Sequence, residues 1–163
     1  MAISRSRELF SLCSLLMGTL FAYSASVQLN DSDWYFWFPL YSCACVVNLT
    51  NCIIIFPKLN RKVAKLALWL GILLFAKVVV EDLVYGISGF WSLDLSERVV
   101  REKTGSLLVI LSMILHLHME QSCVPNKQNQ ISSLVNYGML ILVLFSYMLP
   151  FVFFVVRKGE MKF

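Results

Sequence analysis

Five long apolar stretches, separated by short polar segments, dominate the chain. They cover residues 9–27, 34–56, 63–85, 104–120 and 134–156. A helix needs about 20 mostly apolar residues to cross a bilayer, and only the fourth stretch is clearly short. The pattern predicts an all-α integral membrane helical bundle with five transmembrane helices in a single transmembrane domain, residues 1–163. Four spans are the alternative, if residues 104–120 lie on the surface or re-enter the membrane.

The composition points to the same class of protein. Hydrophobic residues make up 58% of the 163 residues, charged residues only 15%, and the mean hydropathy is +0.72. Ordinary soluble domains carry about 25% charged residues. These values exclude a soluble enzyme, a nucleic-acid-binding domain and a disordered linker. We expect the lipid bilayer to be the main partner, with a membrane protein as a second candidate and no nucleic acid.

The charges indicate an orientation. Most cations of this chain, whose net charge is +4, lie beside the apolar stretches, where Lys and Arg favour the cytosolic side. The polar turn after the first stretch has no Lys or Arg, whereas four follow the second stretch: Lys58, Arg61, Lys62 and Lys65. The N-terminus is therefore expected to be cytosolic. Five spans would place almost equal numbers of Lys and Arg on the two sides of the membrane, whereas four spans would place most of them on the cytosolic side. The charge distribution thus favours four spans, but the length of the fourth apolar stretch favours five. The organelle is not indicated.

A polar turn and the helix after it form the most distinctive segment. The turn contains Gln28, Asn30, Asp31 and Asp33, and Asp31 or Ser32 is placed to cap the next helix. Four-residue spacing puts a row of side chains on one face of that helix. The row consists of Trp37, Tyr41, Cys45, Asn48 and Cys52. Small and polar side chains in such a row are typical of a contact between membrane helices, and a ligand pocket is the sharper alternative.

Other polar residues lie inside the apolar stretches. Asn48 and Asn51 interrupt the second, and Lys77 and Glu81, spaced four residues apart, lie near the end of the third. Ionisable residues at membrane depth are candidates for function. A cation that pairs with Glu81 or snorkels to the interface is the favoured interpretation here, with a proton or ion relay as the alternative.

Nothing in the sequence identifies a catalytic or metal centre. His116 and His118 are two residues apart on a helix, so they face different directions and are expected to be polar residues at the membrane interface. Neither a metal nor a cofactor is expected. A nucleophile elbow, a phosphate loop and an HExxH pattern are all missing. The sequence leaves enzymatic activity open and favours a protein without it.

Two segments together carry a resemblance to a known family. The first is Gln28-x-Asn30-Asp31-x-Asp33-x-x-x-Trp37-x-x-x-Tyr41, and the second is Glu97 followed by Arg101-Glu102-x-x-Gly105. They resemble the transmembrane protein 220 family of small multi-pass membrane proteins, in helix order and spacing over residues 9 to 157. Ser32 departs from the proline that is typical of the family. The family has no assigned biochemical activity, so the resemblance implies an architecture rather than a reaction.

These observations lead to one structural and one functional expectation. We expect Arg101 to pair with Asp31, Asp33 or Glu97 at the outer end of the bundle, beside the aromatic residues of the second helix. The full candidate polar cluster is Gln28, Asn30, Asp31, Asp33, Trp37, Tyr41, Glu97, Arg101 and Glu102. The favoured function is a non-catalytic binding or accessory subunit. The alternative is a membrane-embedded enzyme or carrier for a lipid-like molecule, with a polar site at the outer interface.

Overall fold

A computed structural model describes residues 2–31, 33–53, 57–85, 98–121 and 128–158 of the chain. Within these residues the chain forms five helices: α1 (Ala2–Gln28), α2 (Trp34–Ile53), α3 (Pro57–Tyr85), α4 (Arg98–Gln121) and α5 (Gln128–Lys158). The prediction of an all-α chain with five helices is confirmed. Glu97 lies outside the described residues, as does the side chain of Asn51.

Four of the helices are longer than the apolar stretches that predicted them, whereas α2 ends at Ile53 rather than at residue 56, and residues 54–56 lie outside the described residues. α3 starts at Pro57, six residues before the expected start, and α4 starts at Arg98 rather than at residue 104. Lys, Arg, Glu and Gln are good helix formers, so backbone hydrogen bonding continues into the polar flanks. Proline suits the first position of a helix because its missing N–H has no intrahelical partner there. An apolar stretch therefore marks the bilayer crossing, not the full helix.

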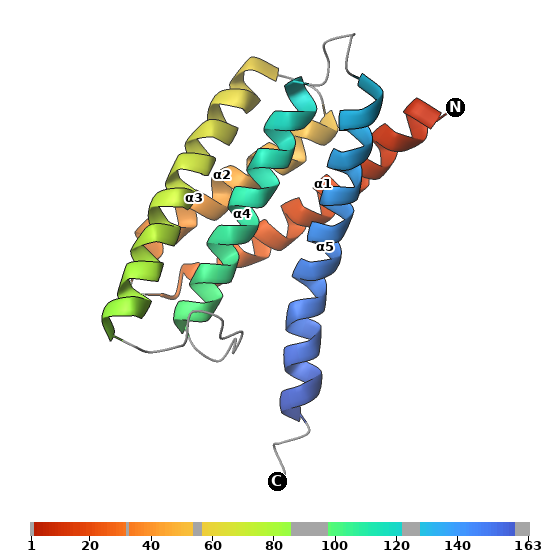
Figure 1. Cartoon of the computed structure of the whole chain (residues 1–163). Coiled ribbons are helices and arrows are strands. Elements are labelled where there is room, and N and C mark those ends of the chain that lie inside the picture. Colours follow the sequence, from red (N-terminus) through yellow and green to blue (C-terminus); the bar gives the residue numbers. More distant parts are fainter. Residues whose placement is uncertain (1, 32, 54–56, 86–97, 122–127, 159–163) are drawn as a thin grey trace.

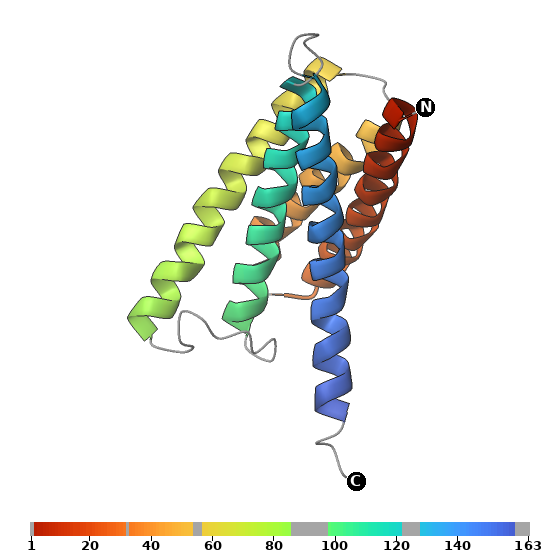
Figure 2. The same cartoon turned by 45° about the vertical axis from the view of Figure 1, so that its right-hand side comes forward.

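The helices run alternately up and down (Figure 1). α1, α3 and α5 end at the bottom of this view, where α2 and α4 begin, and we call this the lower end. The opposite end, which holds the start of α1, is the upper end. A second view shows that the C-terminal half of α5 continues below the other helices (Figure 2). The turn after α1 and the start of α4 therefore lie at the same end of the bundle.

Among the described residues, three helices contain segments that are long and apolar enough to cross a membrane: Glu8–Gln28, Leu59–Val84 and Ser133–Phe151. α2 and α4 lie beside them in the bundle (Figure 1). The α3 segment is the most apolar of the three and has the smallest buried share. The count of five spans remains a prediction.

The core of the bundle contains large apolar side chains and small residues that allow close helix contacts. Trp37, Phe21, Met17, Leu40 and Met113 are almost completely buried. Small residues let the backbones of membrane helices approach closely. Gly18 of α1 illustrates this, because a Cβ atom there would come within 2.9 Å of the Leu49 side chain of α2.

Candidate functional site

The polar turn leads directly into α2 through local hydrogen bonds. The Asp31 N–H donates to the Gln28 carbonyl at 3.0 Å, and the Trp34 N–H donates to the Asp31 carbonyl at 3.3 Å. Asp33 is the residue directly before the helix, and its carbonyl accepts the Phe36 N–H at 3.1 Å. The N-cap position thus belongs to Asp33. α2 begins at Trp34, as expected, so Asp33 rather than Asp31 directly precedes it. Ser32, the other expected cap, lies outside the described residues.

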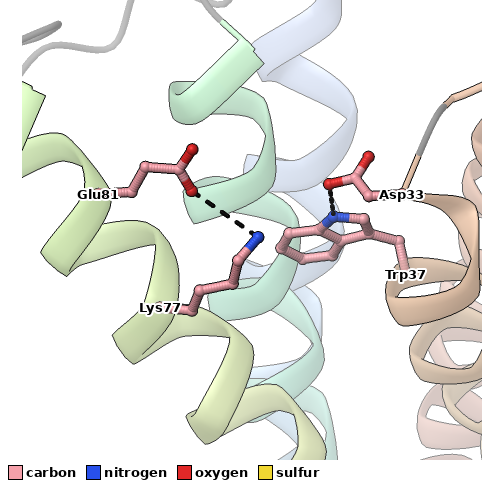
Figure 3. Close-up of polar contacts among 4 residues, drawn as sticks. All are labelled: Asp33, Trp37, Lys77 and Glu81. Carbon is pink, nitrogen blue, oxygen red and sulfur yellow. Dashed lines mark hydrogen bonds and ion pairs between the residues drawn. The ribbon is translucent and has the colours of Figure 1, made fainter.

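The side chain of Asp33 forms a hydrogen bond with Trp37, the first residue of the row on one face of α2. The Trp37 indole N–H donates to the Asp33 carboxylate at 3.3 Å (Figure 3). Trp37 is completely buried, and its ring stacks on that of Tyr41 with centroids 6.3 Å apart. Phe21 of α1 lies on Tyr41 at the same centroid distance. These rings fill the space between α1 and α2 at the lower end of the bundle.

The second motif segment meets this aromatic cluster from α4. The Tyr41 hydroxyl lies against the backbone at Gly105, where a Cβ atom would overlap it. Glu102, one turn earlier, is buried and interacts electrostatically with Tyr41. The structure therefore brings together residues from both motif segments, Trp37 and Tyr41 from one and Glu102 and Gly105 from the other. Glycine is needed here because any larger residue would displace the tyrosine.

Other members of the candidate cluster lie nearer the surface. Asn30 and Arg101 are exposed, and Gln28 and Asp31 are partly exposed. The amide oxygen of Gln28 is buried and has no hydrogen-bond partner among the described residues. The pairing of Arg101 with Asp31, Asp33 or Glu97 stays a prediction.

In the part of the chain that the structure describes, the lower end contains an ion pair that the sequence predicted and another that it did not. Lys77 and Glu81 of α3 lie 3.8 Å apart (Figure 3), as their four-residue spacing suggested. Asp82, the next residue, instead faces α4, and Lys103 donates to its carboxylate at 2.6 Å. Only 3% of the Asp82 side chain and 13% of the Lys103 side chain are exposed. Lys103 had no recognisable partner in the sequence, because the two residues lie on different helices.

A second polar group lies inside the bundle nearer its upper end. Asn48 of α2 is at its centre and is completely buried. Its amide donates to the Ser112 hydroxyl of α4 at 3.2 Å, and its side-chain oxygen lies 2.9 Å from Nε2 of His116. The Ser14 hydroxyl of α1 donates to the Asn48 carbonyl at 2.8 Å and lies 3.3 Å from the same imidazole nitrogen. Asn48 thus joins three helices, as the polar row on α2 suggested.

His116 was expected at the membrane interface, and that expectation was wrong. Its side chain is only 5% exposed and meets the ring of Phe10 edge-on, with centroids 5.2 Å apart. His118 is exposed, as the two-residue spacing implies. Among the described residues, no group of three or more His, Cys, Asp or Glu side chains is placed to hold a metal ion. The imidazole instead belongs to the network around Asn48.

Comparison with known proteins identifies a family of membrane proteins. The family model described as "Transmembrane family 220, helix" matches residues 20–118, which is more than half of the chain. The matched region contains the polar turn, the aromatic row on α2 and the Glu102–Gly105 segment. The comparisons with curated proteins and with solved structures found no match.

Proposed function

Since this chain belongs to transmembrane family 220, and is therefore a multi-pass membrane protein, we propose that it acts as a non-catalytic accessory or binding subunit within the membrane. One observation carries this proposal. Trp37, Tyr41 and Glu102 are all buried. The ring of Tyr41 stacks on that of Trp37, and its hydroxyl lies against Gly105, so these motif residues fill the lower end of the bundle. A carrier or enzyme would instead need such side chains to line a space for its ligand.

The outer face of α3 is the surface that we propose for a membrane partner. α3 lies at the edge of the bundle (Figure 1), and its large apolar side chains point away from the other helices. Those at least 58% exposed are Leu59, Leu66, Trp69, Leu73, Val80, Leu83 and Val84. Lipid covers such a face in a protein that acts alone, whereas an accessory subunit presents it to a second membrane protein.

Site-specific photocrosslinking in native membranes distinguishes these cases. A benzophenone amino acid replaces Leu73 of α3, which is 62% exposed, or Ile141 of α5, which is 64% exposed and serves as the matched control. The proposal predicts a protein adduct of defined size from position 73 and only lipid adducts from position 141. Lipid adducts alone from both positions would contradict an accessory role through α3.

The orientation also forms part of the proposal. We propose five spans, with the N-terminus in the cytosol and the polar turn on the opposite side of the membrane. The cation-rich segment at the start of α3 supports this orientation. In a variant without native cysteines, single cysteines at Asn30 and Lys62 should then react with an impermeant reagent from opposite sides. Reporters at the two termini should also give opposite compartments, whereas the same compartment for both would favour four spans.

One observation favours the alternative, an enzyme or carrier for a lipid-like molecule. Acidic and basic side chains gather at the lower end, among them the buried Glu102 beside the Tyr41 hydroxyl. Liposomes of defined phospholipids that contain the wild-type protein or the Glu102→Gln variant test this alternative. Lipid turnover or transfer that the wild type performs and the variant lacks would replace the accessory role.

A further inference from the structure

We propose that the surface formed by α2 and α3 near the lower end binds the headgroup of a phospholipid that carries both a phosphate and a primary amine, as phosphatidylethanolamine does. The residues that would contact it are Lys77 and Glu81 of α3, beside Phe36 of α2. This inference goes beyond the accessory role and does not depend on it, because the lipid would bind whether or not a protein partner covers the rest of α3.

The ion pair between Lys77 and Glu81 is longer and more exposed than the pair between Asp82 and Lys103. The two charged groups lie 3.8 Å apart, which exceeds the length of a hydrogen bond. Their side chains are 46% and 41% exposed. Asp82 and Lys103 form a closed pair at 2.6 Å and are largely buried. An ammonium group has three N–H donors and a carboxylate accepts several hydrogen bonds, so Lys77 and Glu81 keep hydrogen-bonding capacity for an external group.

The pair lies near the lower end of the bilayer-crossing segment of α3, Leu59–Val84, where a lysine side chain can extend toward the lipid headgroups. The Lys77 ammonium lies over the ring of Phe36, 5.6 Å from its centroid, and therefore level with the first turn of α2. Trp34 and Tyr35 of that turn are about half exposed, and such aromatic residues collect at the membrane–water interface. Figure 3 shows Lys77 and Glu81 reaching from α3 on the side where α2 begins.

The charge of the pair selects the class of lipid. Lys77 offers a cation to the phosphate, and Glu81 offers an anion to a headgroup ammonium that can donate hydrogen bonds. A choline headgroup has no N–H, so it cannot donate to Glu81. An anionic headgroup without an amine is attracted by Lys77 but repelled by Glu81. Charge complementarity therefore favours a zwitterionic lipid with a primary amine over both.

Native mass spectrometry of the full-length protein in mild detergent tests this inference directly. Phosphatidylethanolamine, phosphatidylcholine and phosphatidylglycerol with identical acyl chains are titrated against the wild-type protein. We expect phosphatidylethanolamine to bind about tenfold more tightly than the other two, the factor that one lost charge-assisted hydrogen bond produces. This series needs no variant, so a folding defect cannot obscure it.

Two variants and a control test whether Lys77 and Glu81 cause the preference for phosphatidylethanolamine. Lys77→Gln should weaken phosphatidylethanolamine binding about tenfold. Glu81→Gln should remove the preference for phosphatidylethanolamine over phosphatidylglycerol. Lys65→Gln, at an exposed position nearer the upper end of α3, should change neither. Equal binding of the three lipids by the wild type, strongest binding of phosphatidylglycerol, or an unchanged preference in both variants would each overturn the inference.

Discussion

The contact between Tyr41 and Gly105 gives the sharpest test of the packing at the lower end. A Cβ atom at Gly105 would overlap the Tyr41 hydroxyl oxygen. Tyr41 is only 3% exposed and stacks on Phe21 and Trp37, so its ring has no free space to turn into. Gly105→Ala should therefore force α2 and α4 apart or displace the whole aromatic cluster.

The expected loss follows from two opposing effects. Overpacking a well-filled core costs about 1–3 kcal/mol, and a rigid, buried ring places this site near the upper limit. Alanine in place of glycine recovers about 1 kcal/mol through its higher helix propensity. The net loss is then about 2 kcal/mol, or roughly 4–8 °C in the midpoint of thermal unfolding for a chain of this size. Fluorescence-detected size-exclusion chromatography of heated, detergent-solubilised protein measures this shift.

A second substitution should reverse part of the loss. Without the hydroxyl, the atom closest to a Cβ at Gly105 is the ring Cζ at 3.1 Å, which a small shift of the ring accommodates. Tyr41→Phe combined with Gly105→Ala should thus be more stable than Gly105→Ala alone. Gly71→Ala is the matched control, because its Cβ would lie 3.1 Å from Cγ1 of the Ile110 side chain, and it should lower stability much less than Gly105→Ala. Equal effects at Gly105 and Gly71, or no recovery in the double variant, would refute the reasoning.

Three further predictions concern the polar contacts. Lys103→Ala should cost about 3 kcal/mol because it leaves the Asp82 carboxylate buried without this cation, and exchanging the two charges should recover part of that loss in thermal unfolding. Asn48→Leu should cost about 1–2 kcal/mol in the same assay, since hydrogen bonds between membrane helices contribute about 0.6 kcal/mol on average and about 1.7 kcal/mol at most. If Arg101 pairs with Asp31, reversing the charge of either residue alone should lower the stability by at most about 1 kcal/mol, because Arg101 is exposed. Exchanging the two charges should restore the lost stability.

Each of these predictions has a control. Ser112→Ala removes one hydrogen bond to Asn48 and should cost less than Asn48→Leu; a larger cost would mean that Asn48 is not the centre of the network. A charge exchange between Asp82 and Lys103 that recovers nothing would argue against a direct ion pair. Strictly additive effects at Arg101 and Asp31 would exclude contact between them.

The apolar stretches were enough to predict the helices but not their ends. Apolar length measures how much of a helix the bilayer surrounds, whereas the helix ends where its backbone hydrogen bonds end. The start of α4 illustrates the difference. Arg98–Lys103 reads as a charged linker, yet Val99, Val100 and Glu102 are buried there, because one face of this segment packs on the bundle while Arg101 points outward.

The role of a polar residue could be predicted when it followed from the residue's own helix. It could not be predicted when it depended on a partner in another helix. An amide within an apolar helix must find a hydrogen-bond partner, so Asn48 was a sound candidate for a helix contact. The partners of His116 lie 68 and 102 residues away in the sequence, and no local spacing reveals them. The same holds for Asp82, whose four-residue neighbours gave no hint of Lys103 on the next helix.

The two motif segments combine residues of different roles. Glu102 and Gly105 are three residues apart and face Tyr41, so the close approach of α2 and α4 accounts for both. Trp37 and Asp33 are explained by the start of α2 and its core packing. Asn30 and Arg101 are exposed at the same end, and core packing explains neither of them. If the segments were needed only for folding, these two positions would tolerate any polar residue. If other polar residues at these two positions leave the stability unchanged but impair the function, their role lies at the membrane surface, where a partner or a headgroup can reach them.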